Sequence, residues 1–221
     1  MDTFLRLLLY LVLAVLALSI PYALFVCPWL RRWGSTDEEV QGRLPGDDLV
    51  PKPDWVSTRA IAIAAPPAKV WPWLAQIGYH RAGWYSYDFL HRLMGVAGSV
   101  DDPRRSAQRI VPELQRLRVG DEIRIFAAGV FTVRRVNPPR LLLLTSGEGA
   151  FRLDARVGGM TWLWQLEPAG ENRSRLLVRS RSDYGSLLIM RLLNLLLLEP
   201  GGFLMERKTL LNLRRLAERQ M

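Results

Sequence analysis

The segment from residue 80 to residue 91 carries the most chemically versatile side chains in the chain. Imidazole, phenol and carboxylate groups at this spacing could perform general acid–base catalysis, for example on an enolisable substrate. The same residue types have structural uses, since buried tyrosines pack in cores and an aspartate caps a helix. Ligand contact without catalysis is a third reading. The side chains are His80, Arg81, Trp84, Tyr85, Tyr87, Asp88 and His91.

Aromatic residues also mark two later segments. Trp162 and Trp164 are two residues apart in an alternating stretch, so they share one face of a predicted strand. Phe203 opens the apolar stripe of a predicted C-terminal helix. Aromatic side chains line the pockets of lipophilic ligands, but they also fill ordinary cores. The sequence leaves both readings open.

The composition excludes several classes of site. Cys27 is the only cysteine, so neither an intrachain disulfide nor a cysteine-based zinc site can form. Two histidines do not make a histidine-rich metal centre. The sequence contains no Walker loop, dinucleotide fingerprint, nucleophile elbow or HExxH motif. We therefore expect neither a metal nor a cofactor, and the sequence assigns no catalytic residue.

The net charge of +9 is compatible with a nucleic-acid or anionic-lipid partner. The arginines are spread along the chain, however, and those at positions 173–181 alternate with apolar residues. Such alternation is typical of a strand with one buried face and one solvated cationic face. Aspartate pairs at 47–48 and 101–102 lack the spacing of a calcium loop. We therefore expect no nucleic-acid partner and no cation site.

Residues 7–30 form an uncharged, apolar run that predicts a membrane segment. A helix of this length extends about 36 Å, more than the roughly 30 Å of the hydrocarbon layer. A cleavable signal peptide is the alternative, but no A-x-A cleavage pattern follows the run. We expect a retained single-pass transmembrane helix in the cell membrane. Arg31 and Arg32 follow it, so the positive-inside rule places the C-terminal domain in the cytoplasm.

The rest of the chain reads as a linker and one α+β domain. We expect an anchor over residues 1–32, a linker over 33–55 and a globular domain over 56–221. Patterns in the domain predict one strand, two short helices, a run of antiparallel strands and a long C-terminal helix. In this order a curved antiparallel sheet grips the last helix and leaves a cavity between them. The predicted strands cover residues 57–63, 122–126, 131–136, 141–145, 161–166 and about 175–181, with a further candidate at 151–157.

Five stretches carry a resemblance to a known family. They are WGSTDEEVQGRLPGDDLVPKPDW at 33–55, TRAIAIAAPPAKVWPWLAQIG at 58–78, GWYSYDFL at 83–90, IVPELQRLRVGDEIRI at 110–125 and LLEPGGFLMERKTLL at 197–211. The chain resembles a membrane-anchored bacterial branch of the START-like superfamily, which contains polyketide cyclase/dehydrase and lipid-transport proteins (the SRPBCC group). The resemblance implies a helix-grip fold, whose concave sheet face lines the cavity. It is not specific for any reaction.

Together these observations favour a membrane-tethered binding protein for a hydrophobic ligand. The ligand would be a lipid, an isoprenoid or a polyketide-like molecule held between the sheet and the C-terminal helix. The alternative is a cyclase- or dehydrase-like enzyme acting on a lipophilic substrate, and a third reading is a cavity filled by the protein's own side chains. Leucine-rich residues 187–198 are read as an interfacial lid or as core. The candidate ligand-binding residues are His80, Arg81, Trp84, Tyr85, Tyr87, Trp162, Trp164 and Phe203.

Overall fold

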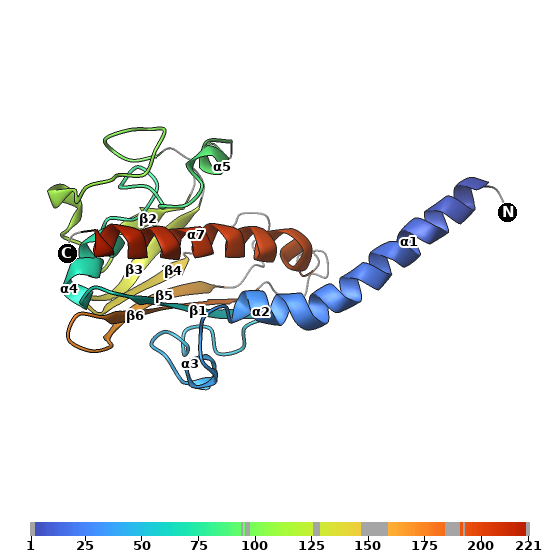
Figure 1. The fold of residues 1–221 in the computed structure, drawn as a ribbon, viewed down its shortest axis with the longest axis horizontal. Helices are drawn as coiled ribbons and strands as arrows, with labels where there is room; N and C mark the ends of the chain where they lie inside the picture. Colours follow the sequence, from blue (N-terminus) through green and yellow to red (C-terminus); the bar gives the residue numbers. More distant parts are fainter. Residues whose placement is uncertain are drawn as a thin grey trace.

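The structure, a computed structural model, describes residues 3–93, 95, 98–125, 129–146, 159–183, 191 and 193–219. Within these residues a six-stranded antiparallel sheet carries a long C-terminal helix across one face, and an N-terminal helical arm extends away from the sheet (Figure 1). The α+β class and the arrangement of the last helix on an antiparallel sheet confirm the fold predicted from the sequence.

The strands are joined in the order β1-β6-β5-β4-β3-β2, and all neighbouring pairs are antiparallel. The first strand of the chain therefore pairs with the last one. The bounds are β1 (Trp55–Ile63), β2 (Glu122–Arg124), β3 (Val130–Asn137), β4 (Leu141–Ser146), β5 (Met160–Pro168) and β6 (Ser174–Ser182).

Most described helices are short, apart from the first and the last. The long C-terminal helix is α7 (Glu199–Glu218), and the π-helical turn η3 (Asn194–Leu198) leads directly into it. The N-terminal arm consists of α1 (Thr3–Pro21), the π-helical turn η1 (Tyr22–Val26) and α2 (Cys27–Arg31). The remaining helices are α3 (Asp37–Gln41), α4 (Pro67–Ala75), α5 (Asp88–Leu93) and the 3-10 turn η2 (Pro112–Leu114).

The spacing of inward-facing residues on each element explains how α7 and β1 meet. Side chains in β1 alternate, so Arg59 and Ile61 point toward the same face of the sheet. On α7, Phe203, Glu206 and Leu210 recur at spacings of three and four, so they lie on one side of the helix. All five side chains are buried. The core lies between these two surfaces, with α4 packed against α7 and β5.

Three predicted segments lie wholly or partly outside the described residues. They are the candidate strand at 151–157, the predicted strand 122–126 at its last residue, and part of the leucine-rich segment 187–198. The leucine-rich segment 187–198 is described only at 191 and 193–198, and the prediction of a lid or core for its first half lies outside the described residues. In its second half, Leu196, Leu197 and Leu198 are exposed.

The apolar run 7–30, predicted as one transmembrane helix, is divided among three helical segments. α1 ends at Pro21, η1 follows, and α2 contains the end of the run. In the described part of the chain, no helix combines the length and the apolar character needed to cross a membrane. α2 packs on the domain, because Cys27 and Leu30 are buried and Arg31 is bonded to Glu199. The single helix expected over this run is therefore corrected to these segments.

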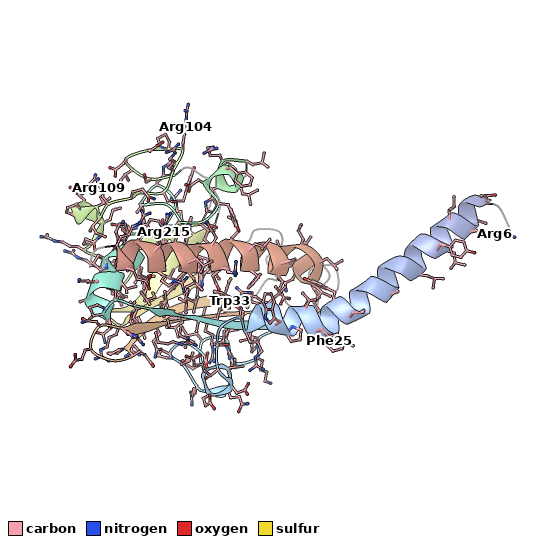
Figure 2. All side chains as sticks on the ribbon, viewed as in Figure 1. Arg6, Phe25, Trp33, Arg104, Arg109 and Arg215 are labelled. Atoms are coloured by element: carbon pink, nitrogen blue, oxygen red, sulfur yellow. The ribbon has the colours of Figure 1, made fainter. Side chains whose placement is uncertain are left out.

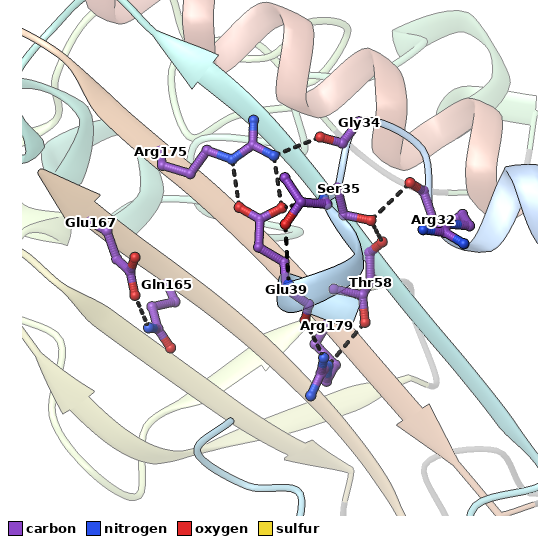
Figure 3. Close-up of polar contacts among 10 residues, drawn as sticks. Arg32, Gly34, Ser35, Glu39, Thr58, Gln165, Glu167, Arg175 and Arg179 are labelled. Atoms are coloured by element: carbon purple, nitrogen blue, oxygen red, sulfur yellow. Dashed lines mark hydrogen bonds and ion pairs between the residues drawn. The ribbon is translucent and has the colours of Figure 1, made fainter. Parts of the chain in front are cut away.

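The segment 33–55, predicted as a linker, is bound to the outer face of the sheet. Arg175 holds both carboxylate oxygens of Glu39, at 2.7 and 2.8 Å (Figure 3). Arg179 donates to the main-chain carbonyl groups of Glu39, Val40 and Gly42 and to the carboxylate of Asp47. The prediction of a solvated cationic face is therefore wrong for Arg179, which is 3% exposed, because this segment covers it.

Gly34 provides a test of how closely this segment lies against β1. Its φ is +74°, and a Cβ atom there would lie 2.2 Å from the carbonyl oxygen of Ala60. Gly170 is a matched control, because its φ is +111° and a Cβ atom would contact nothing within 4 Å. Gly170→Ala should cost only the backbone strain, about 1–2 kcal/mol. Gly34→Ala should lower the free energy of unfolding clearly more, as measured by urea denaturation; equal losses would contradict the close approach.

Candidate functional site

An aromatic cluster lies on the face of the sheet that α7 covers. Its centre is Trp162 of β5, whose ring stacks on Trp84 with a centroid distance of 5.3 Å. Trp164 and Phe131 approach the same ring to 5.1 and 5.7 Å. Trp84, Trp164 and Phe131 are buried, and Trp162 is half-buried. The cluster joins the loop that follows α4 to the middle of the sheet.

A buried ion pair lies beside this cluster. Arg59 Nη1 of β1 is 2.8 Å from Glu206 Oε1 of α7, and the two side chains are only 2% and 8% exposed. The other carboxylate oxygen of Glu206 accepts a hydrogen bond from Trp162 Nε1 at 3.2 Å. Arg59 Nε donates to the main-chain oxygen of Leu30 at 2.8 Å. One pair of side chains therefore joins β1, β5, α7 and α2.

The N-terminal half of α7 is also held to the arm. Phe203 meets the ring of Trp29 edge-on at 5.3 Å, and the guanidinium of Arg59 lies 5.3 Å from the centre of the Phe203 ring. Arg31 of α2 bonds Glu199 through two hydrogen bonds of 2.6 and 2.8 Å. The buried carboxylate of Glu199 is thus neutralised by a partly exposed arginine. Phe203, predicted as a ligand residue, packs where the arm meets α7.

The inner face of β1, β6 and β5 is divided into a polar and an apolar half. The polar half lies toward the start of β1, where Glu206 of α7 bonds to the sheet. The apolar half lies toward the end of β1 and belongs to the main core together with Leu210 and Leu213 of α7. The rows that cross the three strands are Ser57 with Ser180 and Trp162, then Arg59 with Val178 and Trp164, then Ile61 with Leu176 and Leu166.

Large buried side chains lie between the sheet and α7 in the described part of the chain. Trp73, Trp164 and Phe131 are among the largest side chains that are fully buried. Two hollows of about 550 and 250 Å³ lie elsewhere, lined by residues 64 and 169–173 and by residues 49–50, 134, 145–146 and 159–161. A molecule bound between the sheet and α7 would have to part the described side chains.

Two of the predicted site residues have other surroundings. His80 is exposed, and its ring packs 4.0 Å from that of Tyr79. Arg81 is largely buried, and desolvation lowers the pKa of its guanidinium. Arg81 donates hydrogen bonds to three main-chain carbonyl groups around the end of α4, those of Ala75, Ile77 and Leu114. Its role in the described structure is to hold the end of this helix.

The two predicted tyrosines have structural partners. The hydroxyl of Tyr85 accepts a hydrogen bond from Gln76 Nε2 at 2.6 Å, and burial raises the pKa of this hydroxyl. Tyr87 is half-buried, and the ammonium group of Lys208 lies 5.7 Å from its ring centre. A tyrosine with a raised pKa stays protonated, so Tyr85 is suited to hydrogen bonding and not to proton abstraction.

Asp88 and His91 belong to α5. Asp88 Oδ1 accepts hydrogen bonds from the main-chain nitrogen and the hydroxyl of Ser106, at 3.2 and 2.8 Å. His91 is buried; desolvation lowers the pKa of its imidazole, and the charge of Asp88 opposes that shift. No contact among the described residues joins His80, Tyr85 and His91. These three side chains thus have separate surroundings in the described structure, and general acid–base catalysis by this segment was only one of the readings left open by the sequence.

The structure brings together Trp84, Trp162 and Trp164 and adds two residues that the sequence reading did not select. These are Arg59 and Glu206. The signal was present in the sequence, because Arg59 shares the phase of Ile61 and Ile63 in β1. Glu206 lies on the apolar stripe of α7, three residues after Phe203. A charged residue at a core position of each element indicates a buried pair.

The described residues contain no group of three or more histidine, cysteine, aspartate and glutamate side chains able to hold a metal ion. Comparison with models of known protein families finds no match, and comparison with curated proteins also finds none.

Several solved structures match this chain at low similarity. A protein from Nitrosomonas europaea is 16% identical, with a TM-score of 0.44, over 75% of this chain and 95% of its own. The Zhui aromatase/cyclase from Streptomyces sp. R1128 is 16% identical, with a TM-score of 0.42, over 75% and 94%. An HSP90 activator from Plasmodium falciparum is 13% identical, with a TM-score of 0.36, over 63% and 85%. These values are too low to indicate what this chain binds or does.

The fold class is therefore assigned from the geometry of the chain itself. A six-stranded antiparallel sheet with a long C-terminal helix across one face defines an α+β protein of the helix-grip type. Its candidate site is the inner face of the sheet, with the aromatic cluster around Trp162 and the ion pair of Arg59 and Glu206.

The ion pair predicts a specific pattern of stability. Glu206→Leu leaves the guanidinium of Arg59 buried without its counter-charge and should lower the free energy of unfolding by about 3–5 kcal/mol. The double variant Arg59→Met/Glu206→Leu removes both charges and should be more stable than Glu206→Leu alone. Glu122→Gln, which removes the exposed pair with Arg124, should change stability little. A double variant no more stable than Glu206→Leu would contradict the pairing.

His91 predicts a loss of stability in mild acid. Its imidazole has a lowered pKa in the folded state, so the unfolded chain binds the proton more readily. The stability from this burial is present above the unfolded pKa of about 6.5 and is lost as pH falls through the folded pKa, by at most about 1.4 kcal/mol per pH unit. His91→Gln should remove this part of the pH dependence in thermal unfolding between pH 5 and pH 8.

The exposed His80 provides the control, since His80→Asn should keep the acid-induced loss. Asparagine is chosen because His80 has a φ of 59°, a conformation that asparagine tolerates. Equal pH dependence in the wild type and in His91→Gln would show that burial of His91 does not contribute.

Proposed function

We propose that this chain is a membrane-attached protein that binds a hydrophobic molecule between its sheet and α7. The molecule is a lipid, an isoprenoid or a polyketide-like compound. The attachment uses the apolar run 7–30, and Arg31 and Arg32 at its end favour the cytoplasmic side for the domain. The observation that carries the proposal is an exposed apolar surface that continues from the arm onto the domain.

The arm exposes large apolar side chains along its length. In α1, Leu7, Leu13 and Tyr10 are 62, 51 and 64% exposed. Figure 2 shows the arm leaving the domain, with Arg6 near its free end and Phe25 near its root. Soluble monomers rarely expose a contiguous apolar surface of this kind, which is typical of membrane or protein contact.

The same apolar character continues onto the domain where the arm joins it. The hydroxyl of Tyr22 donates to the main-chain oxygen of Leu195 at 3.1 Å, so η1 lies beside η3. We call the exposed side chains around this junction the apolar end surface. They are Leu24, Phe25, Val26, Trp29, Leu196, Leu197, Leu198 and Leu204.

The apolar end surface adjoins the candidate site. Trp29 contacts Phe203, and Phe203 lies under the guanidinium of Arg59, whose partner Glu206 bonds Trp162. A lipophilic molecule that leaves a bilayer at this end therefore meets the N-terminal half of α7 and the aromatic cluster first. An exposed apolar surface that adjoins a buried aromatic cluster supports a binding protein whose ligand comes from the membrane.

Flotation with phosphatidylcholine/phosphatidylglycerol vesicles tests the attachment. The full chain should float with the vesicles and should resist release by high salt, because apolar burial and not charge holds it. Leu7→Glu/Leu9→Glu/Leu13→Glu should leave the chain in the soluble fraction. Leu93→Glu/Val119→Glu changes two exposed apolar residues outside the arm and should float like the wild type. Flotation of the arm variant would contradict attachment through this run.

The ligand part of the proposal has a separate readout. Native mass spectrometry of the full chain released from its membrane should show the chain together with a lipophilic molecule, which organic extraction then recovers. If preparations that float normally show only the chain without a bound molecule, the result contradicts ligand binding and leaves the membrane attachment intact.

A further inference from the structure

Three successive inward-facing side chains of β1 each carry a buried polar atom that has no hydrogen-bond partner among the described residues. The atoms are Trp55 Nε1, Ser57 Oγ and Arg59 Nη2. Side chains of a strand alternate, so these three point to the face on which Arg59 meets Glu206. Ser57 and Arg59 are 1% and 2% exposed. Buried polar atoms are nearly always paired, so a row of three indicates a binding function.

We call Trp55, Ser57 and Arg59 the polar row. Their hydrogen-bonding capacity defines the chemical group of a ligand that fits beside them. An indole N–H and a guanidinium N–H only donate hydrogen bonds, and a serine hydroxyl both donates and accepts. The partner of the row is therefore an acceptor of hydrogen bonds. Two further donors of the aromatic cluster, Trp84 Nε1 and Trp164 Nε1, are also buried without a partner among the described residues.

The charge balance of the site excludes a strongly anionic partner. The positive charge of Arg59 is already matched by Glu206 at 2.8 Å. A carboxylate or phosphate bound beside Arg59 would lie close to the carboxylate of Glu206 in a buried environment, where like charges repel strongly. A neutral oxygen accepts the same hydrogen bonds without this cost.

We propose that Trp55, Ser57 and Arg59 bind the neutral, oxygen-bearing end of the hydrophobic molecule. The class comprises long-chain alcohols, ketones and esters, and the apolar part of the molecule lies against the aromatic cluster around Trp162. This assignment rests on the proposed function, because it names the substrate class of the same site. The polar row fixes the orientation of the molecule, with its oxygen toward the start of β1.

Indole ¹⁵N–¹H spectra of the full chain test the assignment directly. The chain has eight tryptophans, and Trp55→Phe identifies the signal of Trp55. Dodecan-1-ol should shift this signal downfield, as a new hydrogen bond does, and dodecane should not. Trp73 is the internal control: its Nε1 is also buried without a described partner, but it lies on α4, which follows the far end of β1. Its signal should stay unchanged with both probes.

Ser57→Ala tests the row by affinity. The variant should weaken the binding of dodecan-1-ol by about two- to tenfold, the effect of one hydrogen bond, and should leave dodecane binding unchanged. Trp73→Phe should change neither affinity. The spectra of the wild-type chain do not depend on the folding of a variant, so they remain decisive if Ser57→Ala is unstable.

The outcomes separate the two proposals. If both probes shift the cluster signals equally and the Trp55 signal stays in place, the row binds no ligand oxygen, and the proposed function still stands. A larger response to dodecanoate than to dodecan-1-ol overturns the neutral class. If no indole signal responds to any probe, both the assignment of the row and the binding of a hydrophobic molecule between the sheet and α7 are wrong.

Discussion

The buried charges of Arg59 and Glu206 constrain the rest of the structure more than any other contact. Two opposite charges removed from water are tolerated only when each keeps its partner and its remaining hydrogen bonds. The main-chain oxygen of Leu30 bonds Arg59 Nε and the indole of Trp162 bonds Glu206, while Arg59 Nη2 has no partner among the described residues. As a result, α2, β1, β5 and α7 have one common arrangement that satisfies this pair. The aromatic cluster and the arm both follow from that arrangement.

Local sequence patterns predicted the elements of the fold, because strands and helices depend on the period of their own apolar residues. The alternation of β1 and the stripe of α7 are visible without any knowledge of the partner. The arginines on the outer face of the sheet show what the pattern of a single strand does not predict. Arg179 alternates like a residue on a solvated strand face, yet the segment 33–55 covers it, and nothing in the strand itself encodes what packs on it.

The candidate site was predictable only where residues share an element. Trp162 and Trp164 lie on one strand face, so their proximity follows from the sequence. The residues around 80–91 are neighbours in sequence, but His80 and Tyr85 both have positive φ, at 59° and 54°. These two turns send the side chains in different directions, and neighbours in sequence acquire unrelated surroundings. Arg59 and Glu206 are 147 residues apart and meet only in the finished fold.

The π-helical turn η1 has a consequence for the evolution of the arm. A π turn takes up one residue more than an α turn over about the same rotation, so it absorbs that residue without changing the phase of the helix on either side. Loss of one residue within Tyr22–Val26 would therefore restore an α turn and leave the side chains of α1 facing as they do. Loss of one residue within α1 would instead rotate the part of the helix beyond it by about 100° relative to the domain.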